Sequence, residues 1–155
     1  MMGASVAVAL ATISAPRLHV VAGARAARAA FGTFLGAATP LTDEKVSIAM
    51  ASSRGLPIRL PVPGVLELEV TVIRGPRVNV HLISATDWDA FQKVEGRLLG
   101  GRFRFDFPEF QALATGQATL LGRVLDGPYF IIIENPTLGP TAAPCDVHVS
   151  ASLRP

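Results

Sequence analysis

The strongest constraint on the fold is an alternation of apolar and polar residues with a period of two. It is clearest in residues 65–73, Val-Leu-Glu-Leu-Glu-Val-Thr-Val-Ile, where leucine or valine occupies every second position. Successive side chains of a β-strand point to opposite faces, so this segment is predicted to be a strand with one face on a core and the other in water. Similar alternation predicts further strands at residues 46–50, 56–60, 78–82 and 146–153.

The segment Arg74-Gly75-Pro76-Arg77 separates two of these predicted strands and has the composition of a turn. It therefore predicts a β-hairpin in which Val78, Val80 and Leu82 face inward, opposite the apolar face of residues 65–73. Prolines at positions 57, 61 and 63 confine the strand at residues 56–60 to a sheet edge or a bulged course.

One short helix is expected after this turn, at about residues 87–94. Thr86 stands three residues before Asp89, which approximates the capping box of a helix N-terminus. Trp88 and Phe91 are three residues apart and fall on one face of the helix. We expect these two aromatic side chains to close one end of the fold.

Phenylalanines alternate with charged residues in the segment Arg-Phe-Arg-Phe-Asp-Phe at residues 102–107. We expect the phenylalanines in the core and the charged residues outside, where arginine is a favoured interface residue. The alternative is an aromatic groove for a carbohydrate or lipid, formed by these phenylalanines with Phe110, or by Tyr129 and Phe130.

Residues 117–125 and 129–134 complete a set of seven or eight predicted strands in about 110 residues, with turn signals at intervals of about ten. The predicted fold class is mostly β: an antiparallel, jelly-roll-like β-sandwich with one short helix. This domain is expected at residues 41–155.

Residues 1–40 are predicted to form an alanine- and glycine-rich, partly helical N-terminal arm. Three arginines and no acidic residue give this arm a charge of +3, whereas eleven basic and twelve acidic residues leave the remainder at −1. The apolar run at residues 4–13 is shorter than the about 20 residues that span a bilayer. No basic residue precedes that run, although a secretory signal normally begins with positive charge. The arm is therefore interpreted as an anchor to a partner or membrane surface, and the alternative is a cleaved leader.

Composition limits the remaining possibilities. The single cysteine, Cys145, excludes an internal disulfide and a cysteine-rich zinc site. Only 17% of the residues are charged, against about a quarter in ordinary soluble domains, so part of the surface is expected to meet another apolar surface. The arginines are scattered, and this argues against nucleic-acid binding, which needs a concentrated basic face with stacking aromatics.

An order of motifs gives the chain a resemblance to a known family. It runs from Asn79-Val80-His81-Leu82 through Trp88 and Phe91 to Gly127-Pro128-Tyr129-Phe130 and Glu134-Asn135. Between about residues 46 and 153 the chain resembles bacterial and archaeal GOLD-like (Golgi dynamics) and pre-peptidase C-terminal β-sandwich domains. The resemblance implies a non-catalytic domain, usually outside the cytoplasm, that contacts proteins, lipids or carbohydrates. Asparagine at 79, proline at 128 and glutamate at 134 depart from the family pattern.

Catalytic and metal-binding arrangements are weak in this sequence. No glycine-x-serine-x-glycine elbow for a nucleophilic serine occurs. His81 and His148 occupy outward positions on predicted strands and would share a metal only if those strands were neighbours. Asp87 and Asp89 have two interpretations, as calcium ligands together with Asp106 or Glu109, or as favourable charges at a helix N-terminus, and the second is preferred. No enzyme activity, cofactor or metal is predicted.

The sequence favours a non-catalytic interaction module, an accessory subunit of a membrane-associated protein assembly docked through its N-terminal arm. Its expected partners are other subunits, with membrane contact through residues 1–40 and the sandwich outside the cytoplasm, in the periplasm. The alternative is a secreted or periplasmic module that binds a carbohydrate or lipid and carries an atypical signal peptide. The candidate partner-binding residues are Arg17, Arg25, Arg28, Phe31, Phe34, Leu35, Arg102 and Arg104.

Overall fold

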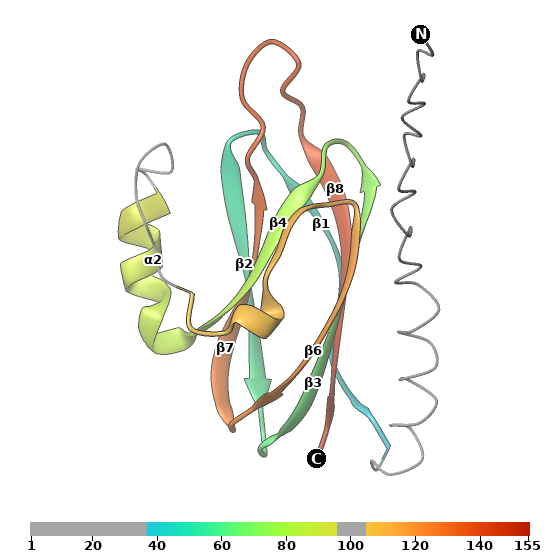
Figure 1. The fold of residues 1–155 in the computed structure, drawn as a ribbon, viewed down its shortest axis with the longest axis vertical. Coiled ribbons are helices and arrows are strands. Elements are labelled where there is room, and N and C mark those ends of the chain that lie inside the picture. Colours follow the sequence, from blue (N-terminus) through green and yellow to red (C-terminus); the bar gives the residue numbers. More distant parts are fainter. Residues whose placement is uncertain (1–36, 96–104) are drawn as a thin grey trace, which may run out of the picture. The chain divides into compact units, whose positions relative to one another are not determined.

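The computed structural model describes residues 37–95 and 105–155. In these residues two antiparallel sheets of four strands each pack face to face, which confirms the predicted β-sandwich (Figure 1). The strands are β1 (Thr39–Ile48), β2 (Ser52–Leu60), β3 (Gly64–Arg74), β4 (Val78–Ser84), β5 (Ala112–Thr115), β6 (Gln117–Val124), β7 (Gly127–Asn135) and β8 (Cys145–Arg154).

The strand orders are β1-β8-β3-β6 in one sheet, called sheet A, and β2-β7-β4-β5 in the other, called sheet B. This arrangement of eight strands in two sheets is that of a jelly roll. β2 lies at the edge of sheet B, as its prolines predicted.

The core lies between the inner faces of the two sheets. Leu66, Leu68 and Val70 of β3 are buried there, and the alternate residues 147, 149, 151 and 153 of β8 are buried beside them, as the period-two pattern predicted. Burying apolar area contributes about 25 cal/mol per Å², so these alternating side chains are the main source of stability in the domain.

The predicted β-hairpin at residues 74–77 is wrong. β3 pairs with β6 and β8 in sheet A, whereas β4 pairs with β5 and β7 in sheet B. The turn carries the chain from one sheet to the other, so the apolar faces of β3 and β4 meet across the core instead of side by side. Gly75 has a φ of +100°, and a Cβ there would come within 2.5 Å of the carbonyl oxygen of Pro144. Glycine therefore permits this tight crossing.

Helix α2 (Trp88–Glu95) follows a short 3-10 turn, η1 (Ala85–Asp87), and packs against the outer face of sheet B. Trp88 and Phe91 therefore cover a sheet face, and the expectation that they close one end of the sandwich is wrong. Ser84, not Thr86, precedes the first helical residue, and its hydroxyl donates to the carboxylate of Asp87.

The phenylalanines at 105 and 107 do not continue a strand. A second 3-10 turn, η2 (Pro108–Phe110), follows them, and the two rings go to different places. Phe107 packs edge-on against Tyr129 beside the main core, whereas Phe105 lies on the outer face of sheet B. Phe103 lies outside the described residues.

Candidate functional site

Sheet B brings polar residues of two strands together on its outer face. In β4, Val78, Val80 and Leu82 point into the core, so the alternate residues Asn79 and His81 point outward. The pairing of β4 with β7 sets Asn79 opposite Glu134. The polar cluster is the set Asn79, His81, Gln111 and Glu134.

Hydrogen bonds connect the whole polar cluster. The Nδ2 atom of Asn79 donates to Oε2 of Glu134 at 3.2 Å, and Nε2 of His81 lies 3.4 Å from the same oxygen. Nε2 of Gln111 lies 3.5 Å from Nδ1 of His81. Because buried polar groups need partners, this network allows imidazole and carboxylate to lie beneath the surface.

An aromatic ring covers the histidine of the polar cluster, whereas Gln111 is exposed. The ring of Phe105 stacks on the imidazole of His81 with 3.7 Å between ring centroids and an interplanar angle of 5°. His81 is consequently only 2% exposed. The expectation of a surface histidine is wrong at this position, because the outer face of sheet B is covered where the sequence pattern implied water.

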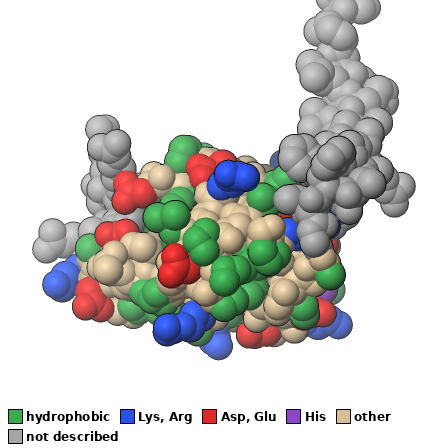
Figure 2. Space-filling view, turned by 90° about the horizontal axis from the view of Figure 1, so that it is seen from below, with side chains coloured by type: hydrophobic (Ala, Val, Ile, Leu, Met, Phe, Trp, Pro, Cys, Tyr) green, Lys and Arg blue, Asp and Glu red, His purple; other side chains and the backbone are tan. Residues whose placement is uncertain are grey.

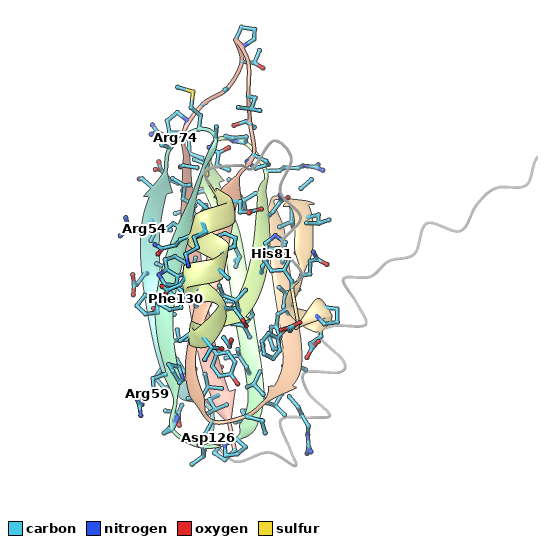
Figure 3. The ribbon with its side chains drawn as sticks, turned by 90° about the vertical axis from the view of Figure 1, so that its left-hand side faces the viewer. Arg54, Arg59, Arg74, His81, Asp126 and Phe130 are labelled. Carbon is cyan, nitrogen blue, oxygen red and sulfur yellow. The ribbon has the colours of Figure 1, made fainter. Side chains whose placement is uncertain are left out.

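An apolar cluster covers the neighbouring part of the same outer face of sheet B. Trp88 stacks on Phe130 with 4.3 Å between ring centroids, and Phe91 packs with Ile83 and Ile132. Figure 3 shows His81 and Phe130 on the face of the sheet that carries helix α2. Sheet B is therefore buried on both faces around β4 and β7.

The carboxyl of Glu134 has a pKa below its ordinary value. Burial alone raises the pKa, but hydrogen bonds from His81 and Asn79 and the charge of His81 together outweigh burial. The carboxylate form is thus stabilised inside the protein. The arrangement joins β4, β7 and the segment before β5 through one ionised group.

The two titratable groups of the polar cluster, His81 and Glu134, are buried. His148 lies on sheet A, where Nε2 is 2.5 Å from Oδ1 of Asp43, so the two described histidines belong to different sheets and do not share a metal. Among residues 37–95 and 105–155, no group of three or more histidine, cysteine, aspartate or glutamate side chains has metal-binding geometry. The proposed calcium grouping around Asp87 does not form there.

A second candidate lies at one end of the sandwich, called the apex. It comprises the β1–β2 turn (49–51), the β3–β4 turn (75–77) and the β7–β8 loop (136–144). The three strand residues on each side of each connection are included. The strand pairings place all three connections at this end, and Figure 1 shows the β7–β8 loop rising beyond the sheets.

Apolar side chains project from the apex. Met50 and Ile73 are each 55% exposed, and Leu138 is 56% exposed. Three exposed arginines, Arg54, Arg74 and Arg77, lie among the apex residues. Figure 3 shows Arg74 near the top of the sheets and Arg54 below it.

The apex carries a net positive surface. It contains two carboxylates: that of Asp146 is half-buried and is paired with Nε of Arg74 at 3.1 Å, and that of Glu134 is buried. Arg54 and Arg77 have no carboxylate partner within the described part of the chain. Three guanidinium groups against the carboxylates of Asp146 and Glu134 leave the apex at +1.

The β7–β8 loop is fixed at its root by Asn135, which is fully buried. Its Nδ2 atom donates to the carbonyl of Ala143 at 2.8 Å and to that of Ile48 at 3.4 Å. Its Oδ1 atom accepts from the hydroxyl of Thr137 at 2.5 Å. One amide therefore holds both ends of the loop against the β1–β2 turn, and Asn135 has a structural role.

The opposite end, called the base, carries the β2–β3 and β6–β7 turns and residue 155. A pocket of about 280 Å³ lies there, lined by Pro63, Gly64, Val65, Arg123, Val124, Leu125 and Pro155. Figure 2 looks onto the base and shows apolar side chains across it, with acidic and basic side chains among and around them. The hydroxyl of Tyr129 donates to the carbonyl of Leu125 at 3.1 Å and fixes one wall.

Every candidate partner-binding residue named from the sequence lies outside the described residues, in 1–36 or 96–104. The structure therefore gives new candidate residues and does not place the eight that were named from the sequence. Sequence reasoning missed the polar cluster and the apex. A signal for the first existed, because the unbroken Ile131-Ile132-Ile133 run indicates a strand buried on both faces.

The chain matches no protein-family model, and no curated protein is similar to it. Within residues 37–95 and 105–155, none of the helices has the length and apolar character needed to cross a membrane.

Proposed function

We propose that this protein is a non-catalytic interaction module, an accessory subunit of a membrane-associated assembly. The supporting observation is the apex, where three apolar side chains and an excess of positive charge face outward on a well-anchored frame. Exposed methionine, leucine and arginine together are typical of contact surfaces. The polar cluster agrees with a scaffold role, because its histidine and glutamate tie strands together.

In this proposal residues 1–40 are a second contact, with Arg17, Arg25, Arg28, Phe31, Phe34 and Leu35 as partner-binding residues. Arg102 and Arg104 are further candidates in the segment that precedes Phe105. The sandwich is proposed to lie outside the cytoplasm, in the periplasm. The kinship with GOLD-like and pre-peptidase C-terminal domains is part of the proposal, and the two-sheet fold is consistent with it.

Affinity purification of the tagged full-length chain from membranes of its native source tests the proposal. The wild-type chain is expected to bring other subunits with it, whereas the double substitution Phe31→Asp and Phe34→Asp is expected to lose them. Gln92→Ala, an exposed change on α2, is the matched control and should retain the partners. Recovery of the chain alone from membranes, or equal recovery of partners by all variants, would contradict docking through the arm.

A second candidate function is ligand binding at the base pocket. Its lining is mostly apolar, and Arg123 supplies one guanidinium that has no carboxylate partner in the described chain. Such a pocket suits a small apolar carboxylate, such as the end of a fatty acid. Calorimetric titration with a medium-chain fatty acid would show saturable binding that Arg123→Ala weakens, and no heat of binding would reject this function.

A further inference from the structure

We infer that the apex is a docking surface for a membrane rich in anionic lipid. This inference deepens the proposed function by naming one partner and the surface that meets it. It concerns described residues of the sandwich and does not depend on the N-terminal arm.

The apolar residues of the apex are arranged for insertion as separate side chains. Met50, Ile73 and Leu138 each come from a different connection or strand end, and each is more than half exposed. A protein partner would need a shaped pocket for each anchor. The interfacial region of a bilayer accepts separate apolar side chains without such complementary shapes.

The β7–β8 loop can enter the lipid headgroup region at a small cost in free energy. Its nine residues, Pro-Thr-Leu-Gly-Pro-Thr-Ala-Ala-Pro, include no charged side chain. Asn135 and Thr137 fix its root, and the amide of Ala142 donates to the carbonyl of Gly139 at 3.0 Å across its tip. Because the loop is already held by these bonds, less conformational entropy is lost when it docks.

The charge of the apex selects the lipid. Arg54 and Arg77 have no carboxylate partner in the described residues, and the apex as a whole carries a net charge of +1. Basic residues close to a membrane surface are attracted to anionic headgroups within about one Debye length. The apex therefore matches an anionic surface better than a neutral one.

Fluorescence from a probe at each end of the sandwich tests the orientation in the full-length chain. Leu138→Cys at the apex and Leu125→Cys at the base are exposed sites for an environment-sensitive dye, whereas Cys145, the chain's single natural cysteine, is buried. With vesicles of phosphatidylcholine containing about 30% phosphatidylglycerol, emission from position 138 should shift to shorter wavelength and that from position 125 should not. The unsubstituted chain treated with the dye is the control for labelling of Cys145.

Charge reversal at two matched pairs of basic residues tests the selection for anionic lipid. Arg54→Glu with Arg77→Glu at the apex is expected to weaken binding to these vesicles by about tenfold or more. Arg59→Glu with Lys93→Glu makes the same charge change at exposed positions outside the apex and should leave binding close to that of the wild type. Vesicles of phosphatidylcholine alone should bind the wild type more weakly than anionic vesicles.

Three results would overturn the inference: no vesicle binding by the wild type, binding with an unchanged signal at position 138, or equal loss of binding from the apex pair and the control pair. The first would point to an acidic protein surface as the partner of the apex. The second would assign membrane contact to residues outside the apex. Because purified protein and lipid suffice, failure here is separate from failure of the co-purification that tests the proposed function.

Discussion

The indole ring of Trp88 lies directly on the backbone of Gly55. A Cβ built at Gly55 would come within 2.4 Å of the ring carbon Cη2 of Trp88. The helix that covers sheet B therefore approaches strand β2 at a place where any side chain would push the indole away, and the contact links an edge strand to the outer aromatic layer.

Gly55→Ala is expected to destabilise the protein by about 1–3 kcal/mol, because the added methyl group must displace Trp88 from Phe130. Urea denaturation followed by circular dichroism measures the change. Gly116→Ala is the matched control, since a Cβ there meets nothing within 4 Å, and its effect should stay within about 0.5 kcal/mol. Equal stability of the two variants would show that Trp88 does not occupy this position.

Phe91→Ala is expected to cost about 3–5 kcal/mol, because the ring is buried against Ile83 and Ile132 and its removal leaves a cavity. Gln92→Ala changes the adjacent, exposed position of α2 and should cost little. Thermal unfolding of both variants checks the prediction. A small loss at position 91 would argue that α2 is not part of the folded core.

Asn135→Ala is expected to destabilise the domain by about 2 kcal/mol or more. The substitution leaves the buried carbonyl of Ile48, the half-buried carbonyl of Ala143 and the amide of Thr137 without their partner. Amide hydrogen exchange should also rise in the β7–β8 loop, because its root is released. Thr141→Ala, an exposed change in the same loop, is the control. Unchanged exchange in the Asn135 variant would mean that another contact holds the loop.

Glu134 is expected to make stability depend on acidity. Its pKa in the folded protein lies below the ordinary value of 4.5, so the unfolded chain binds more protons when the pH is near or below that value. The contribution of Glu134 is therefore present above about pH 5 and is lost as the pH falls through the lower, folded pKa.

The substitution Glu134→Gln removes this titration. Denaturation in urea at a series of acidic pH values should show a steeper loss of stability in the wild type than in the variant. Parallel curves for the two proteins would indicate that the carboxylate is not stabilised by His81 and Asn79.

The two-layer fold could be predicted because the alternation in β3 and β8 indicates which face of each strand is apolar. This can be recognised without knowing which strands pair with it. Pairing partners could not be predicted in the same way. The turn at residues 74–77 reads as a hairpin, since its composition is shared by turns within a sheet and turns between sheets. The strand pairings distinguish the two cases, and the packing of Gly75 against Pro144 and Cys145 agrees with a turn between sheets.

The candidate site was less predictable than the fold. His81 reads as an exposed residue because it alternates with Val80 and Leu82, and the pattern does not reveal that Phe105 returns to cover it from 24 positions further along the chain. The apex shows the same difficulty, since Met50 and Leu138 come from separate connections. Their proximity at one end follows from strand pairing, not from spacing in the sequence.

The crossing turn between β3 and β4 has a kinetic consequence. Within the described residues, each of the remaining connections without a helix also passes from one sheet to the other. Only β4 and β5 are consecutive strands that pair with each other, and α2 and η2 lie between them in the sequence. Most ladders thus join segments remote in sequence, such as β1 with β8 and β2 with β7. Chains with such high contact order fold in about milliseconds to seconds, so newly made copies would expose unpaired strands until synthesis reaches residue 154.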